Sequence, residues 1–393
     1  MNHRKTRNFS FNERGFSLIE LLVVMAILVF AIAVSASMFT SILGQSKQQG
    51  RIAETQLENL PGLEMLRSDI EHAGYGLPWS VPSVSGIVYS EAQVNPAADP
   101  ANNFNEVNAP WGGVPRAFSG DQVGVNVLGS SYFVIRAANV AMNDQSQRWT
   151  MVSNKPVQGT IDGLTGLGSD RPQIGQGVIV LEMRSAETFR QLHMYGTAFS
   201  IGYTEPLNTN FSPPPMEHPG DATEPAQSYM VYGIDNASPV RMPFNRADYF
   251  ISLNSIPSTC AAGTGVLTKY TVNHNGGSLT AFPVIDCVAD FQVSFGLDTN
   301  TDNVIDQWLA SLPAATYGPE QIRKMVKEVR VYILLHEGRM DPSFTFSDFT
   351  GGGTSVRVGD TYGGRNFDLA AIANFQNYRW KVITMVVTPK NLQ

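Results

Sequence analysis

Residues 14–39 read RGFSLIELLVVMAILVFAIAVSASMF, and this stretch decides how the N-terminal part of the chain folds. From Phe16 to Phe39 it contains 24 residues with a single charge, that of Glu20. A helix of this length, at about 1.5 Å per residue, is about 36 Å long and can cross a hydrocarbon core of about 30 Å with some tilt. The sequence therefore predicts a membrane-spanning helix over residues 16–39.

A short basic segment precedes this span. Residues 1–14 contain four lysines and arginines against one acid, Glu13. Because positive flanks stay on the cytoplasmic side, we expect this segment to be cytoplasmic and the large C-terminal part to be exported. An ordinary secretory signal has a shorter apolar run followed by a small-residue cleavage site. Here the small residue, Gly15, comes before the run.

Glu20 is the unusual residue of the span. A carboxylate in apolar surroundings costs several kcal/mol unless it is paired or neutralised. If the chain is cut after Gly15, Phe16 becomes a new N-terminus with a cationic amine, about one helical turn from Glu20. Such an amine, offered by a neighbouring subunit, could pair with Glu20 and set the axial register of a helical bundle. The alternative is a plain signal anchor with Glu20 at the level of the lipid headgroups.

The string from Arg14 to Glu20, RGFSLIE, resembles the cleavage and methylation site of type IV prepilins and type II secretion pseudopilins. In that family the prepilin peptidase cuts after the glycine and N-methylates the phenylalanine. The resemblance therefore implies removal of residues 1–15 as a leader, methylation of Phe16 and an assembly role for Glu20.

Beyond the span the pattern becomes amphipathic, and we expect one long helix over residues 16–75, with its amphipathic half at 40–75. Pro61 is expected to kink it. Residues 76–393 are expected to form an exported, β-rich globular domain, because short apolar runs alternate there with turn signals. The expected strands are 122–128, 132–136, 177–183, 229–234, 266–272, 289–297, 327–335 and 379–387, with irregular segments at 78–120 and 203–228. The fold class is therefore α+β.

The C-terminal part resembles PilW-type minor pilins. The resemblance rests on residues 284–308, VIDCVADFQVSFGLDTNTDNVIDQW, with weaker likeness at 72–76, 326–335 and 378–383. It implies a minor pilin that primes pilus assembly or joins the tip complex, with roles in twitching and adhesion. Its partners would be other minor pilins, the major pilin, the prepilin peptidase and the inner-membrane assembly platform. The alternatives are a J-type pseudopilin of a type II secretion system and a membrane-anchored adhesin or enzyme.

An Asp-rich segment follows the predicted strand 289–297. Oxygen-bearing side chains or a backbone carbonyl recur at every second position, as in calcium loops: Asp298, Asn300, Asp302, Val304 and Asp306. Two positions depart from that pattern, because Asn303 replaces the usual glycine and Leu309 the bidentate glutamate. Calcium is therefore a possible cofactor, although no cofactor is required. The alternative is an Asx-rich hairpin without metal.

The remaining candidates are few. Cys260 and Cys287 lie in the exported part, where an oxidising compartment allows a disulfide. A bridge between them would stabilise the folded state by about 3 kcal/mol. The alternative is two buried thiols. The histidines are scattered and no hydrolase, zinc-protease or nucleotide-binding motif occurs, so we predict a protein that is not an enzyme. With a net charge of −7 and no basic stripe, nucleic acid is not an expected partner.

Overall fold

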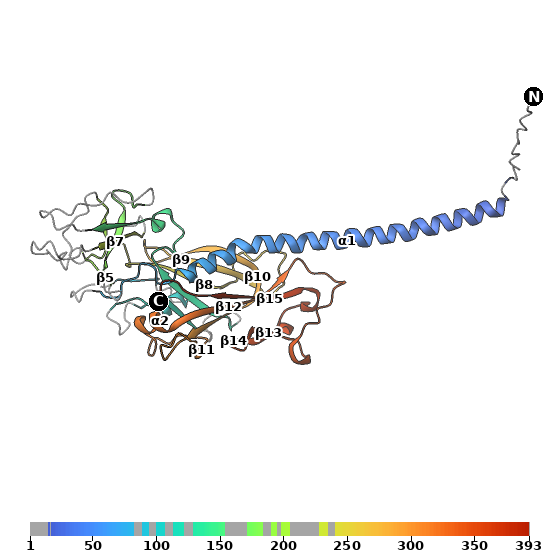
Figure 1. Cartoon of the computed structure of the whole chain (residues 1–393). Coiled ribbons are helices and arrows are strands. Elements are labelled where there is room, and N and C mark those ends of the chain that lie inside the picture. Colours follow the sequence, from blue (N-terminus) through green and yellow to red (C-terminus); the bar gives the residue numbers. More distant parts are fainter. Residues whose placement is uncertain are drawn as a thin grey trace, which may run out of the picture. The chain divides into compact units, whose positions relative to one another are not determined.

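The computed structural model describes residues 15, 17–81, 89–93, 100–106, 113–121, 129–153, 171–183, 190–194, 198–204, 228–234 and 240–392. The chain divides into two compact units, residues 1–54 and 55–393. In chain order, a long helix α1 (Leu18–Glu71) is followed by a sheet-rich body (Figure 1). The α+β fold class predicted from the sequence is confirmed.

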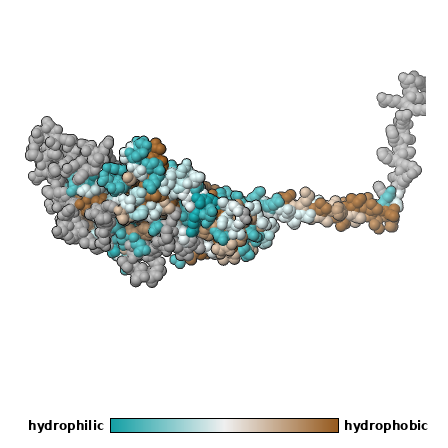
Figure 2. Space-filling view, turned by 90° about the horizontal axis from the view of Figure 1, so that it is seen from below, coloured by the Kyte–Doolittle hydropathy of each residue, from teal (hydrophilic) through white to brown (hydrophobic). Residues whose placement is uncertain are grey.

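The first unit contains the apolar half of α1. Its large hydrophobic side chains are exposed throughout, from Leu18 at 82% to Leu43 at 43%. Figure 2 shows this end of the helix as a nearly continuous hydrophobic surface. By length and composition the helix can cross a membrane. Because such a surface is unfavourable in water, this half needs a lipid or protein environment.

In the second unit the same helix becomes part of the core. Leu66 and Ile70 are fully buried, and the helical assignment continues through Pro61 without interruption. Gly62 permits the close approach of the helix to the sheet, because a Cβ atom added there would lie 2.1 Å from the carbonyl oxygen of Val284. The helix is followed by a turn with positive φ at Gly74, close to the end that the sequence predicts.

A buried polar contact joins the helix to the sheet. The carboxylate of Asp69 accepts a hydrogen bond from the Tyr249 hydroxyl at 2.6 Å and lies 2.5 Å from the Lys269 ammonium. Burial raises the pKa of Asp69 in spite of the nearby Lys269. The pair fixes the helix at one position over two neighbouring strands, since neither charge can be solvated elsewhere in the core.

The main sheet of the body is antiparallel, with strand order β1-β2-β8-β9-β10-β12-β15. These strands are β1 (Phe118–Asp121), β2 (Tyr132–Ala137), β8 (Asn245–Ser252), β9 (Gly265–Val272), β10 (Leu279–Leu297), β12 (Val326–Glu337) and β15 (Arg379–Val387), and β11 (Gln307–Leu309) pairs with β10. Val331 of β12 lies opposite both Val293 of β10 and Met385 of β15, and all three side chains are buried. This row illustrates how alternating apolar residues build the core.

A second sheet has the order β3-β7-β4-β5, with β6 paired to β4. Its strands are β3 (Trp149–Ser153), β4 (Gly177–Met183), β5 (Arg190–Leu192), β6 (Ile201–Gly202) and β7 (Ser228–Gly233). A separate hairpin joins β13 (Ser355–Asp360) to β14 (Gly363–Asp368). The described short helices are η1 (Pro100–Phe104), η3 (Asp144–Gln147), α2 (Pro319–Met325), η4 (Thr350–Gly352), η5 (Leu369–Ala371) and η6 (Phe375–Asn377).

Most predicted strands are present within one or two residues of the expected bounds, although β10 starts ten residues earlier than expected. The predicted strand 122–128 and residues 205–227 of the predicted loop 203–228 lie outside the described residues. Strand β8 was not predicted, because its Asn245, Arg246 and Asp248 look like a polar loop. All three side chains are buried instead.

A buried ionic network explains this strand and corrects the prediction for residues 78–120. The carboxylate of Glu91 lies 2.8 Å from Arg136 of β2 and 2.9 Å from Arg246 of β8, and all three side chains are fully buried. Glu106 and Arg116 extend the network. The described part of segment 78–120, predicted to be a mostly irregular surface segment, therefore sends charged side chains into the core.

Candidate functional sites: N-terminal motif, disulfide and Asp-rich loop

The N-terminal motif begins the helix with a capping box. The Ser17 hydroxyl accepts from the Ile19 backbone N–H at 3.4 Å, and the Glu20 carboxylate accepts from the Ser17 N–H at 3.0 Å. The carboxylate therefore points toward the N-terminal end of the helix, the side on which a cut after Gly15 would create an amine. Phe16 itself lies outside the described residues.

The predicted disulfide is present between Cys260 and Cys287. It connects the segment between β8 and β9 to β10, at a point where the pairing of β10 with both neighbours is irregular. His336 of β12 packs beside it, and its Nε2 accepts from the Ala261 backbone N–H at 2.9 Å. Because the two sulfur atoms are bonded to each other, this cluster does not have the thiolates that a metal site would need.

His336 is itself a buried titratable group. Its ring contacts Tyr378 at 4.5 Å and Trp380 at 5.4 Å between ring centres. Burial lowers the pKa of His336 to about 4. The histidine is therefore neutral at pH 7 and acts as a hydrogen-bond acceptor that holds the loop carrying Cys260.

The Asp-rich segment forms a tight loop between β10 and β11. Thr301 and Asn303 adopt positive φ values of 64° and 65°, so Asn303 has the left-handed conformation expected of the residue that replaces glycine. The fully buried Asp298 carboxylate accepts from the backbone N–H groups of Asp302 at 3.2 Å and Asn303 at 2.9 Å. The loop is thus folded around Asp298.

Other oxygen atoms of the loop that could bind a metal also accept hydrogen bonds. The Asn300 side-chain oxygen accepts from the Asp302 N–H, and the Asp306 carboxylate accepts from the Thr299 N–H and hydroxyl. Lys327 lies 3.9 Å from Asp298. Val304 is exposed. The structure brings the five predicted residues into one loop. The atoms they offer to a metal ion are all oxygen, the ligand that calcium prefers.

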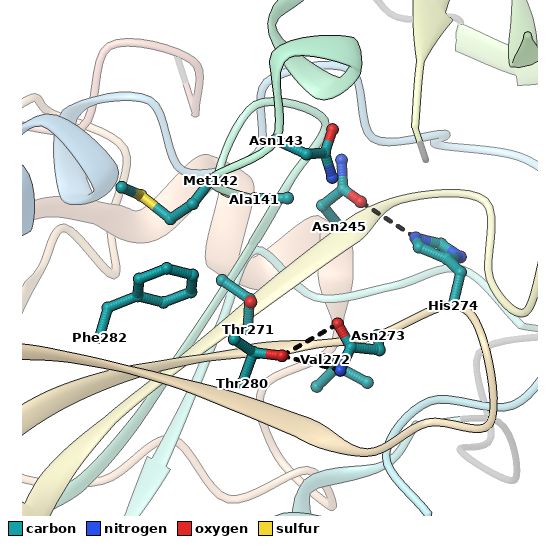
Figure 3. A pocket seen from close by; sticks show the side chains of 10 residues that line it. All are labelled: Ala141, Met142, Asn143, Asn245, Thr271, Val272, Asn273, His274, Thr280 and Phe282. Carbon is teal, nitrogen blue, oxygen red and sulfur yellow. Dashed lines mark hydrogen bonds between the residues drawn. The ribbon is translucent and has the colours of Figure 1, made fainter. Parts of the chain in front are cut away.

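A polar pocket of about 230 Å³ lies over β8, β9 and β10 (Figure 3). His274 accepts from the Arg241 N–H through Nδ1 and contacts the Asn245 side-chain oxygen through Nε2 at 3.0 Å. Asn273 and Thr280 bond to each other. Both nitrogens of the histidine are occupied by structural hydrogen bonds, so it does not have the arrangement of a general base.

Comparison with known proteins gives two family matches. Residues 249–391 match the family described as type IV pilus-assembly protein W. Residues 10–36 match the prokaryotic N-terminal methylation motif. No curated protein matches the chain.

Among solved structures, a type IV-like pilin from Thermus thermophilus is similar, with 17% sequence identity and a TM-score of 0.21. The match covers 38% of this chain and 79% of that chain. The methylation motif stands directly before the apolar helix, and the PilW match begins within β8 and covers most of the main sheet. The chain thus combines the N-terminal methylation motif of type IV prepilins with a C-terminal region similar to the type IV pilus-assembly protein W family.

Proposed function

We propose that this minor pilin helps to prime pilus assembly or occupies the tip complex. The observation that carries the proposal is the combination of the methylation motif with a PilW-type region in one chain. The body of residues 55–393 is large, and a large body is easier to place at a filament end than between packed subunits. The partners would be other minor pilins, the major pilin and the inner-membrane assembly platform.

Before assembly, the prepilin peptidase would cut between Gly15 and Phe16 and methylate the new amine. The protein would first be a single-pass inner-membrane protein with its body in the periplasm, and later part of the pilus on the cell surface. The exposed apolar surface of α1 and the match over residues 10–36 support this route. Intact-mass analysis with and without the peptidase should show loss of residues 1–15 and gain of one methyl group. A chain that stays unprocessed would contradict the proposal.

The assembly role can be tested in the source cells. Deletion of the gene should reduce surface pili, and the full chain supplied in trans should restore them. Immunogold labelling of the body should then mark filament ends or bases rather than filament sides. Uniform labelling along the filament would contradict a priming or tip role, whereas unchanged pili in the deletion strain would contradict any assembly role.

The alternative functions are a J-type pseudopilin of a type II secretion system and a membrane-anchored adhesin or enzyme. The match to the pilus-assembly family favours the pilus over the secretion system. Loss of protein secretion with normal pili in the deletion strain would favour the pseudopilin. The family points to a structural protein, and we propose no catalytic activity.

We further propose that the Asp-rich loop binds calcium through Asp298, Asn300, Asp302, the Val304 carbonyl and Asp306. The left-handed Asn303 and the oxygen-only donor set support the proposal. Thermal unfolding of the full chain in lipid nanodiscs should shift upward with calcium and downward with a chelator. Asp302→Asn should abolish the shift, while Asp348→Asn, outside the loop, should keep it. A melting temperature that does not change with calcium would contradict the proposed calcium site.

A further inference from the structure

Two arginines stack on one tryptophan at the surface of the body. The guanidinium carbon of Arg323 lies 4.0 Å from the ring centre of Trp79, and that of Arg190 lies 4.6 Å from it. Trp79 belongs to the segment after α1, Arg190 is the first residue of β5 and Arg323 lies in α2 (Figure 1). All three residues are half-buried. The fold therefore brings two permanent cations from distant parts of the chain to one aromatic ring.

The backbone holds these residues in place. The N–H groups of Trp79 and Ser80 donate to the Arg190 carbonyl at 2.8 Å and 3.2 Å, and the Leu192 N–H donates to the Ser80 carbonyl at 3.0 Å. Helix α2 is anchored by Ile322, which is fully buried. Because the groups are already ordered, a ligand that binds them loses less entropy.

Neither cation is neutralised by the described part of the chain. Within the described residues, Arg190 and Arg323 make no ion pair and no side-chain hydrogen bond. Glu320, which attracts Arg323, already bonds to Lys324 at 2.6 Å. Burial lowers the pKa of both arginines, and Arg190 lowers that of Arg323 further because the two cations repel each other. The pair is therefore electrostatically unfavourable as it stands.

Other partly or fully buried arginines of the body have acidic partners. Arg116 lies 2.5 Å from the Glu106 carboxylate, and Arg365 lies 2.8 Å from that of Asp290. A guanidinium that has lost part of its hydration without gaining an acceptor is unfavourable by comparison. An anion that comes from outside the chain would supply the acceptor that Arg190 does not have.

The polar side-chain atoms that this cluster leaves free are all donors. The Nε atom of Arg190 is buried without a partner, so no ligand can reach it. The terminal nitrogens of both arginines and the indole N–H of Trp79 are not buried in this way and bond to no described residue, so they stay accessible. Guanidinium and indole groups donate hydrogen bonds and accept none. A site of this composition selects a ligand rich in acceptor oxygens.

A phosphate group matches these donors better than a carboxylate does. A phosphate monoester carries a charge of about −1.5 to −2 at pH 7 and has three terminal oxygens, so it can balance both cations and bond to three donor groups. Arginine also pairs with phosphate through two parallel hydrogen bonds. A carboxylate brings a single charge and two oxygens, so it would leave one cation of the pair uncompensated.

We propose that Trp79, Arg190 and Arg323 bind a phosphate group, either free or as a monoester on a larger molecule. Terminal nitrogens of the two guanidinium groups and the indole N–H would donate to its terminal oxygens. The site would join Arg323, inside the PilW match, to two residues outside that match. This inference does not depend on leader cleavage, on the priming role or on calcium binding.

Isothermal titration calorimetry on the full chain in lipid nanodiscs at neutral pH and low salt tests the proposal. Empty nanodiscs give the background. The probes are inorganic phosphate, glycerol 3-phosphate and acetate. We expect saturable binding of at least one of the two phosphates, and binding of acetate at least about tenfold weaker. Tighter binding of inorganic phosphate would identify the free ion as the ligand, and the reverse order a phosphate carried by a larger molecule.

Variants connect the binding to the cluster. Arg190→Gln and Arg323→Gln should each weaken phosphate binding about tenfold or more, because each removes a charge-assisted hydrogen bond. Trp79→Phe keeps an aromatic ring, loses the indole N–H and should weaken binding by a smaller factor. The matched control is Arg357→Gln, which removes the same charge from an exposed position on β13 and should leave binding unchanged.

Thermal melts identify any variant that has lost its fold. Arg190→Lys then replaces Arg190→Gln, and it should also weaken binding, because lysine keeps the charge without the planar fork of the guanidinium. The proposal fails if neither phosphate binds, or if acetate binds as tightly as phosphate. It also fails if both arginine variants bind phosphate like the unmodified protein, since the two arginines would then only pack on the indole.

Discussion

At the scale of single residues, Glu91 illustrates a buried charge held by two opposite charges. Although burial opposes ionisation, Arg136 and Arg246 lower the pKa of its carboxyl below the ordinary value. Its stabilising effect is therefore present above the unfolded-state pKa and is lost as the pH falls through the lower folded-state pKa. The network thus ties Glu91 and Glu106 to the arginines of strands β2 and β8 at neutral pH.

We predict that Glu91→Gln lowers the free energy of unfolding by about 3–5 kcal/mol, because it removes a buried carboxylate that balances the charges of both Arg136 and Arg246. Urea denaturation at pH 7 measures the change. The matched control is Glu320→Gln in the exposed pair with Lys324, which should cost less than about 0.5 kcal/mol. Equal effects of the two substitutions would show that the buried network does not stabilise the fold.

His336 provides a prediction about pH. The unfolded chain takes up a proton on this histidine below about pH 6.5, while the folded chain takes it up only near pH 4. The contribution of His336 to the free energy of unfolding is therefore fully present above pH 6.5 and is lost as the pH falls toward 4. At pH 4.5 the loss is about 2–3 kcal/mol. In His336→Gln the difference in unfolding free energy between pH 7 and 4.5 should shrink by that amount. Tyr378→Phe keeps the histidine and should keep the full difference.

At the scale of elements, the contact between α1 and β10 depends on Gly62. A methyl group there would collide with the backbone of Val284, so Gly62→Ala should destabilise the body by about 1–3 kcal/mol in spite of alanine's better helix propensity. Gly50→Ala, at a position with open space around it, should be neutral or slightly stabilising. Urea midpoints compare the two, and a stabilising Gly62→Ala would contradict the close helix–sheet contact.

At the scale of the whole molecule, we propose that Glu20 connects the membrane helix to assembly. We predict that Glu20→Ala is cleaved and methylated normally but enters pili at least about tenfold less, because no carboxylate remains to pair with a neighbouring amine. Immunoblots of sheared pili against membranes measure the ratio. Ser37→Ala removes a hydroxyl that bonds within the same helix and should assemble normally. Normal incorporation of Glu20→Ala would remove Glu20 from the assembly mechanism.

The sequence by itself determined the features that depend on neighbouring residues. The apolar run after Gly15 determined the helix, and the string RGFSLIE determined the family of the N-terminus. Alternating apolar residues determined the strands β4 and β15, whose bounds were predicted correctly. The disulfide was predicted as one of two alternatives, because the compartment favours oxidation but does not specify the partners' geometry.

Only the tertiary structure decided the features that depend on residues far apart. Glu91 and Arg246 are separated by 155 positions, and no local periodicity shows that their charges neutralise each other. For the same reason β8 was missing from the predicted strands, since buried polar residues are favourable only with the partners that the fold supplies. Tyr75, Trp149 and Tyr232 likewise line one pocket, although they lie far apart in the sequence.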